Sequence, residues 1–154
     1  MKLQRIDQVK NIDRLAKIIY INFLELQNQP DINFSINDIV STLSSGNFLG
    51  WLLLKDDGTI IGYMVGEHKD IGDGRYVYFL SYFYIVKKYR AKGMGFKMMM
   101  NCIQYIKNIN IKYIMLISNI FSDAFRLYSK LGFVPDPILK LNNNNYAVLI
   151  YYCN

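Results

Sequence analysis

The order of apolar and polar residues predicts a chain that alternates between strands and helices. Alternating or continuous apolar runs predict strands at residues 2–6, 48–55, 60–67, 75–86, 113–118, 133–139 and 146–152. Apolar residues spaced three and four apart predict helices at 11–27, 35–43, 95–108 and 122–131. The first helix is expected to end before Pro30, and Gly46 to terminate the second. Pro135 and Pro137 place the strand at 133–139 on a sheet edge.

The strand at 75–86 is apolar or aromatic along its length, which indicates that other elements cover both of its faces. Strict alternation predicts one face with Val77, Phe79, Phe83 and Ile85 and a second with Tyr76, Tyr78, Leu80, Tyr82 and Tyr84. In the next helix, the spacing directs Phe96, Met99, Met100, Ile103 and Ile106 toward the sheet. Strand, helix and strand in this order predict a right-handed crossover between two parallel strands.

Composition favours a globular protein of one domain. The 154 residues are 52% hydrophobic and 19% charged, and neither a repeat nor a linker divides them, so we expect one domain over 1–154. No eighteen-residue apolar run and no leader-like start are present, which favours a cytoplasmic, intracellular protein without a membrane segment. Cys102 and Cys153 suit two idle thiols in that compartment. His68 is the only histidine, so a multi-histidine metal site is excluded and no metal is expected.

A glycine-bearing turn connects the long strand to the helix that follows. It runs from Arg90 through Gly93 to Gly95, with the sequence RAKGMG. Glycines allow a sharp bend, and the first N–H groups of the helix have no partner within the helix, so the turn suits a phosphate. It matches neither a P-loop nor a dinucleotide fingerprint, because Met98 stands where the latter has its third glycine.

Two motifs together resemble the GNAT family, the acetyl-coenzyme A-dependent N-acetyltransferases. The first is R-x-x-G-x-G after a strand, formed here by Arg90, Gly93 and Gly95. The second is A-x-x-L-Y-x-K-L-G-F, which residues 124–133 match. The resemblance covers most of the chain. It implies an α/β fold with a mixed, splayed β-sheet of about six or seven strands flanked by about four helices, in which the cofactor wedges beside the central strand.

The resemblance also assigns residues to acetyl-CoA. The backbone of Phe83, Tyr84 and Ile85 would bind the pantetheine arm and the thioester, and Tyr128 would donate a hydrogen bond to the departing thiolate. Lys130 would lie near the nucleotide. The pyrophosphate would be cradled by Arg90, Ala91, Lys92, Gly93, Met94, Gly95 and Phe96. Phe121 occupies the position of a common pantetheine-binding asparagine, so either Asn119 substitutes for it through a shifted loop, or the contact is absent.

The acceptor side is less defined by the sequence. No Asp or Glu occurs between Arg75 and Val86, so no carboxylate of the central strand can act as general base. Ser81 or Tyr82 would instead hold a water relay. Glu25 and Tyr146 are the candidates for binding the acceptor amine.

The leading hypothesis is transfer of an acetyl group from acetyl-CoA to a primary amine of a small molecule or a protein, with CoA as product. The missing carboxylate keeps open a silent CoA-binding module. A net charge of +6 and 13 tyrosines keep open a nucleic-acid binder, which the scattered basic residues disfavour. The protein is expected as a monomer or a homodimer, and the sequence does not name the acceptor.

Overall fold

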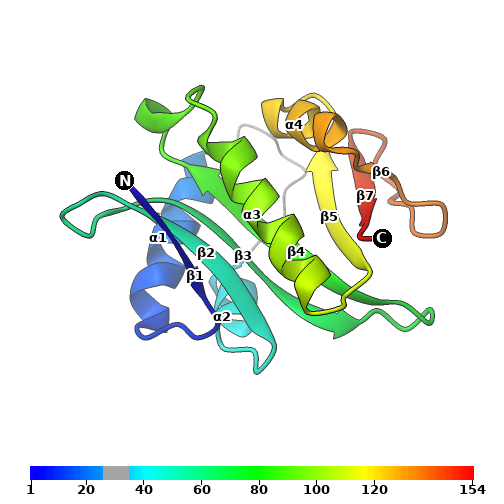
Figure 1. Ribbon diagram of the computed structural model, residues 1–154, viewed down its shortest axis with the longest axis horizontal. Helices are drawn as coiled ribbons and strands as arrows, with labels where there is room; N and C mark the ends of the chain where they lie inside the picture. Colours follow the sequence, from blue (N-terminus) through cyan, green and yellow to red (C-terminus); the bar gives the residue numbers. More distant parts are fainter. Residues whose placement is uncertain (26–34) are drawn as a thin grey trace.

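The computed structural model describes residues 1–25 and 35–154 (Figure 1). Its strands pair into a single sheet, and helices lie against both faces of it. The elements, in chain order, are β1 (Lys2–Ile6), α1 (Ile12–Glu25), α2 (Ile36–Leu43), β2 (Phe48–Leu54), β3 (Ile60–Asp70), β4 (Tyr76–Ile85), the 3-10 turn η1 (Lys87–Tyr89), α3 (Met94–Asn108), β5 (Tyr113–Asn119), α4 (Asp123–Leu131), β6 (Val134–Pro135) and β7 (Tyr146–Tyr152).

The sheet has seven strands in the order β1-β2-β3-β4-β5-β7-β6. Only the β4–β5 pair is parallel, and α3 forms the crossover between these two strands. This confirms the mixed α/β sheet and the parallel pair predicted from the sequence. The β6 strand lies at the edge, as predicted, but it is reduced to two residues because the two prolines prevent a longer ladder.

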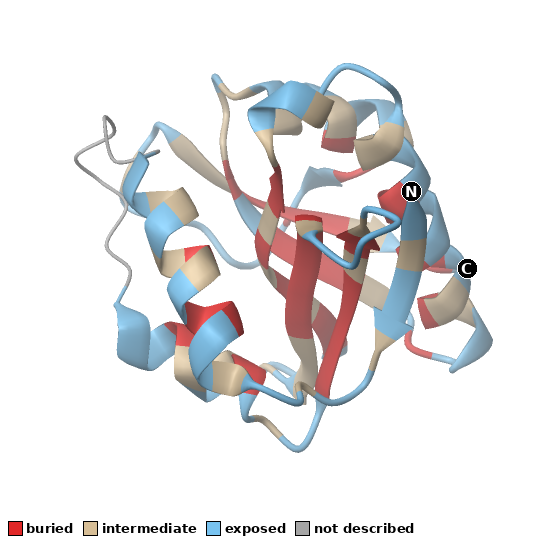
Figure 2. Cartoon of the chain, turned by 90° about the vertical axis from the view of Figure 1, so that its left-hand side faces the viewer, coloured by how far each residue is buried: buried red, intermediate tan, exposed pale blue. Residues whose placement is uncertain are grey.

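Two apolar clusters fill the space between the helices and the sheet. One joins the buried face of α3 and Tyr128 of α4 to Trp51 and Tyr78 of the sheet. The other joins α1 and α2 to the opposite face, where Tyr63 and Val65 of β3 are fully buried. Figure 2 shows α1 and α2 beside the strands on that second face.

The helix boundaries follow from capping side chains. Ser35 caps α2 by accepting a hydrogen bond from the backbone N–H of Asp38 at 3.1 Å, as the sequence predicts. Ser122 caps α4 in the same way. The prediction that Gly46 terminates α2 is wrong, because Ser44 is the C-cap and donates its N–H to Val40. The expected end of the first helix near Pro30 lies outside the described residues.

A bulge at Ser81 overturns the predicted faces of the central strand. Val65 of β3 pairs with Tyr82, but the next residue, Gly66, pairs with Leu80, so Ser81 is an extra residue in β4. The alternation therefore shifts by one position. Before the bulge, Tyr78 and Leu80 face α3, whereas after it the side chains that face α3 are Phe83 and Ile85, and Tyr82 and Tyr84 face α1.

Gly66 is required opposite this bulge. A Cβ atom built on Gly66 would lie 2.1 Å from the carbonyl oxygen of Phe79, closer than any side chain tolerates. A glycine within a strand is often the mark of a bulge or of a close backbone approach, and both apply here.

The buried face of α3 also differs from the prediction. Met99, Ile103 and Ile106 are buried as expected, but the remaining inward positions are Met98 and Cys102. Phe96 and Met100 are 51% and 45% exposed. Phe96 and the methionines near it make more than one face of the helix apolar. Periodicity alone therefore predicted a face that differs from the buried one by a rotation about the helix axis.

A buried ion pair ties the β3–β4 hairpin to the segment after β6. The guanidinium of Arg75 donates to both carboxylate oxygens of Asp136, at 2.6 and 3.0 Å, and also to Asp73. Asp136 accepts two further hydrogen bonds, from the N–H groups of Ile138 and Leu139. Hydrogen bonding from Arg75 is the main reason that the pKa of Asp136 lies below its ordinary value.

We predict that Asp136→Asn lowers the free energy of unfolding by about 3 kcal/mol, because it leaves the Arg75 cation without its buried partner. The folded protein lowers the pKa of Asp136, so the wild type keeps this stabilisation above the unfolded pKa of about 3.9 and loses it as the pH falls through the folded value. Urea denaturation of both proteins between pH 2 and 7 measures the effect.

Asp56→Asn is the matched control, since Asp56 is fully exposed and its one bond to the described residues is to the N-terminal ammonium. It should unfold close to the wild type. Equal stability of the Asp136→Asn protein and the wild type at pH 7 would show that the ion pair contributes nothing.

Candidate active site

The split between β4 and β5 forms the centre of the site. Their parallel pairing covers only Tyr78–Leu80 of β4 and Ile114–Leu116 of β5. Beyond it, β4 stays paired with β3 as far as Ile85. In the described part of the chain, no strand pairs with the other edge of β4 past residue 80, and the two strands diverge toward their C-terminal ends (Figure 1). The backbone of Phe83, Tyr84 and Ile85 therefore lines an opening in the sheet.

The glycine turn leads from this opening into α3. Gly93 is the N-cap of α3 with φ of 77°, a left-handed conformation that suits glycine, and Ala91 also has a positive φ of 61°. No side chain caps the first turn of α3. A Cβ on Gly93 would meet nothing within 4 Å, so the space above the turn is open. The free N–H groups of the helix start and this open space fit a pyrophosphate.

Gly95 brings three elements into contact beside the turn. A Cβ at this position would lie 3.3 Å from Leu127 of α4, 3.4 Å from Phe83 and 3.7 Å from Ile85 of β4. A larger residue would push α3 away from the other two elements. The second glycine of the turn thus fixes the position of the helix start, whereas the first provides the bend.

Arg90 fixes the turn on the strand. Its Nε donates a hydrogen bond of 2.6 Å to the carbonyl oxygen of Ile85, and its guanidinium lies 4.9 Å from the ring centre of Tyr84. The sequence motif assigned Arg90 to the pyrophosphate. In this structure the side chain is bound to the end of β4, and its positive charge lies beside the glycine turn.

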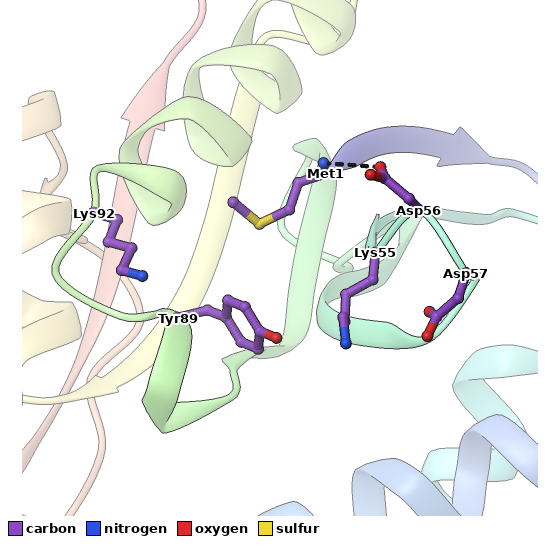
Figure 3. Close-up of a pocket in the computed structure, with 6 residues that line it drawn as sticks. All are labelled: Met1, Lys55, Asp56, Asp57, Tyr89 and Lys92. Carbon is purple, nitrogen blue, oxygen red and sulfur yellow. Dashed lines mark hydrogen bonds and ion pairs between the residues drawn. The ribbon is translucent and has the colours of Figure 1, made fainter.

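Lys92 points away from α3 into a pocket of about 340 Å³ (Figure 3). The pocket is lined by Tyr89 and by the N-terminal and β2–β3 turn residues Met1, Lys55, Asp56 and Asp57. The ammonium of Lys92 lies 5.8 Å from the ring centre of Tyr89. Lys92 thus contributes its backbone to the glycine turn, while its side chain adds positive charge on one flank of it.

Tyr128 lies on the inner side of α4, next to the split. Its ring is buried, 6.4 Å from Phe83 and 5.6 Å from Phe133 between ring centres. Burial raises the pKa of its hydroxyl well above 10, so the group stays protonated and can donate a hydrogen bond at any physiological pH. Its hydroxyl bonds no other residue of the described chain, so it is available to a group in the split.

On the sheet face that packs against α1, the side chains beside the split are aromatic. Ser81 is the bulged residue, and Tyr82 packs edge-on against Phe23 of α1 at 5.5 Å. Burial, with a smaller contribution from the Asp38 carboxylate, raises the pKa of Tyr82 to about 12. Its hydroxyl is therefore a poor proton acceptor at neutral pH and suits the holding of a water molecule. Glu25 is exposed at the end of α1.

Asn119 and Tyr146 meet at the other side of the opening. They pair across β5 and β7. The Oδ1 atom of Asn119 accepts from the N–H of Phe121 at 2.8 Å, and its carbonyl accepts from the hydroxyl of Ser122. Both oxygens thus shape the turn into α4, while Phe121 is 74% exposed. Lys130 is exposed on α4.

The structure adds residues that sequence patterns did not single out. Tyr63 stacks on Tyr84 at 5.9 Å, and its hydroxyl donates to Asn22 of α1. Asp38 lies close enough to Tyr82 to influence its hydroxyl. The tyrosines of the central strand were visible as a group in the sequence. Their partners come from a different helix and strand, which no local pattern identifies.

The sequence model of the Acetyltransferase (GNAT) family matches residues 12–133. The chain belongs to the GNAT acetyltransferase family. The match includes the split, the glycine turn and Tyr128, which are the features described above. No curated protein matches the chain in a sequence search.

Solved structures of GNAT proteins share the fold at low sequence identity. Arabidopsis thaliana NAA60 in complex with a bisubstrate analogue is 15% identical, with a TM-score of 0.71 and coverage of 98% of each chain. Tetrahymena GCN5 is 13% identical, with a TM-score of 0.72 over 100% of this chain and 97% of its own. A GNAT acetyltransferase from Staphylococcus aureus Mu50 is 21% identical, with a TM-score of 0.69 over 99% and 100%.

Residues 1–25 and 35–154 hold no group of three or more His, Cys, Asp or Glu side chains that could bind a metal ion. None of their helices has the length and apolar character needed to cross a membrane.

We predict that Gly93→Ala weakens acetyl-CoA binding by about tenfold or more, because the added methyl group would enter the open space above the turn and displace charge-assisted hydrogen bonds. Isothermal titration calorimetry of the folded variant measures the affinity.

Gly72→Ala is the matched control. Gly72 has φ of 86° and equally open space around its Cβ, but it lies in the β3–β4 turn. Both variants should lose about 1 kcal/mol of stability from the left-handed backbone. If both bind acetyl-CoA like the wild type, the glycine turn does not hold the cofactor.

Proposed function

We propose that this protein is an acetyl-CoA-dependent N-acetyltransferase that acts on a primary amine. The observation that carries the proposal is the open edge of β4 between the start of α3 and the hydroxyl of Tyr128. A molecule with a pyrophosphate at one end and a thioester at the other fits this arrangement. In support, one structure of Arabidopsis thaliana NAA60 contains acetyl-CoA, and family membership makes acetyl transfer the expected chemistry.

Each part of the site has a distinct role in the proposed reaction. The start of α3 and the residues from Arg90 to Phe96 bind the pyrophosphate. The carbonyl of Ile85 already accepts from Arg90, and the remaining open backbone groups of Phe83, Tyr84 and Ile85 pair with the amides of the pantetheine arm, as a further strand would. Lys130 adds positive charge at the nucleotide end. Asn119 holds the turn that presents α4, and its own contact with pantetheine stays a prediction.

The proposed reaction requires a neutral amine and a stabilised leaving group. The amine loses a proton to water held near Ser81 and Tyr82, and its nitrogen forms a bond to the acetyl carbon. The carbon–sulfur bond breaks, and sulfur leaves with the electron pair. Tyr128 donates a hydrogen bond to the sulfur as its charge develops. Glu25, at the end of α1, and Tyr146, on β7, are the proposed amine-binding residues.

Thiol release from acetyl-CoA, followed over a panel of amines, tests the enzyme against the alternative of a silent CoA-binding module. The proposed function requires amine-dependent release together with an acetylated amine identified by mass spectrometry. Tight binding of acetyl-CoA without any amine-dependent release would favour the silent module. The GNAT family match argues against a nucleic-acid binder as the main function.

We predict that Tyr128→Phe lowers turnover about ten- to a thousandfold while acetyl-CoA affinity changes little, because the variant removes only the hydrogen-bond donor. Steady-state kcat with the best amine and calorimetric affinity measure the two effects.

Tyr105→Phe is the control, since Tyr105 packs on Trp51 near the far end of α3. It should retain the wild-type rate. Should Tyr128→Phe turn over at that rate as well, Tyr128 would be a packing residue and water would protonate the leaving group.

We also predict a preference for peptide α-amines over lysine side chains. An α-amine of pKa about 8 is about tenfold disfavoured in its neutral form at pH 7, against more than a thousandfold for a lysine side chain of pKa about 10.4. A site without a carboxylate on β4 therefore favours the α-amine. Comparison of kcat/KM for an unblocked peptide and its N-acetylated, lysine-containing analogue measures the preference, and faster lysine acetylation at neutral pH would contradict it.

A further inference from the structure

Ile117 is 48% exposed although it lies in β5, a strand with neighbours on both sides in the sheet. On one side it pairs with Val148 of β7. On the other side the pairing with β4 ends at Leu116, one residue earlier. The exposure of Ile117 is therefore a consequence of the split. It places an uncovered apolar side chain at the rim of the opening.

The side chain of Ile117 lies on the sheet face opposite α3 and α4. Alternation along β5 places Ile114 and Leu116 in the cluster that includes α3, and Met115 in a separate cluster on the other face. Ile117 shares the face of Met115. Tyr82 also lies on this face, on the far side of the split.

A hollow of about 240 Å³ lies on the β7 side of Ile117. Val148, the pairing partner of Ile117, lines this hollow together with Ile120, Leu139, Leu141 and Tyr146. The charged residues of its lining are Asp136 and Lys140, and Arg75 neutralises Asp136 through two hydrogen bonds. Asn143 and Asn144 also line it, so the hollow combines apolar surface with side-chain amides and holds no unpaired carboxylate.

We propose that Ile117 and this hollow form an apolar subsite for the acceptor, so that the substrate is an amine with an apolar side chain next to the reacting nitrogen. The inference rests on the proposed function. With the pyrophosphate at the start of α3 and the leaving sulfur at Tyr128, the cofactor occupies the face of those helices. The amine then approaches from the opposite face, where Ile117 and the hollow lie.

The chemistry of the subsite excludes strongly charged neighbours of the amine. A cationic side chain would meet Lys140 and an Asp136 that is already saturated by Arg75. An anionic side chain would lose water against Ile117 and Val148. The exposed ammonium of Lys140 would return little of that cost, because solvent screens an exposed ion pair. A leucine-sized side chain gains by leaving water, and this gain corresponds to about tenfold or more in kcat/KM.

Four short peptides with a free α-amine test the subsite with the wild-type protein. They differ only in the first residue, which is Leu, Ser, Asp or Lys, and the residues after it are uncharged. The Leu peptide should exceed the Asp and Lys peptides in kcat/KM by about tenfold or more. Ile117→Asn should remove most of this preference through KM while acetyl-CoA affinity is unchanged. Ile109→Asn is the control, because Ile109 is also partly exposed but lies at the C-terminal end of α3.

Ile117→Glu gives a second test that loss of folding cannot imitate. It should raise kcat/KM for the Lys peptide relative to the Leu peptide, which is a gain for one substrate. Equal rates for the four peptides, or the same preference in the Ile117 variants and the wild type, would overturn the subsite. If other amines were acetylated but none of the four peptides was, the subsite would also be overturned, while the proposed function would stand. Absence of any acetylated amine would reject both.

Discussion

The separation of β4 from β5 is the constraint on which the rest of the structure depends. A strand inside a sheet normally satisfies backbone groups on both edges, and β4 does so only as far as Leu80. Past that residue one edge faces an opening, and its N–H and C=O groups need polar partners there. Water can serve in the free protein. In the proposed function, the amides of a pantetheine arm would take the place of this water, as a further strand would.

Several contacts position the strands and helices around this opening. At its head, Arg90 bonds the carbonyl of Ile85 and Gly95 allows α3 to touch Leu127 and Phe83. At the other end of β4, Arg75 and Asp136 tie the hairpin to the chain beyond β6. Between them, the bulge at Ser81 turns Tyr82 and Tyr84 to one face and Phe83 and Ile85 to the other. Hydrogen bonds and packing within the fold thus set the positions of the elements around the opening.

The sequence predicted most elements because their signals are local. Ser35 and Ser122 mark helix starts by hydrogen bonds to residues three positions away, and β7 has the bounds that its apolar run predicts. The faces of β4 were predicted wrongly, because the bulge depends on the close approach of Gly66 to Phe79 across two strands. The exposure of Ile117 was likewise invisible, since it depends on where two strands part.

A site arranged in this way must rely on orientation more than on base strength. The central strand carries no carboxylate, and the pKa of Tyr82 is raised to about 12, so neither supplies an effective base at neutral pH. Holding an amine and a thioester at a reactive distance can replace a large part of the entropic barrier of a bimolecular reaction. The split would provide for this in the proposed function, since each of its two faces would receive one of the two reactants. In the proposed reaction, Tyr128 acts on the sulfur from the face opposite the amine, where a donor assists bond cleavage without protonating the nucleophile.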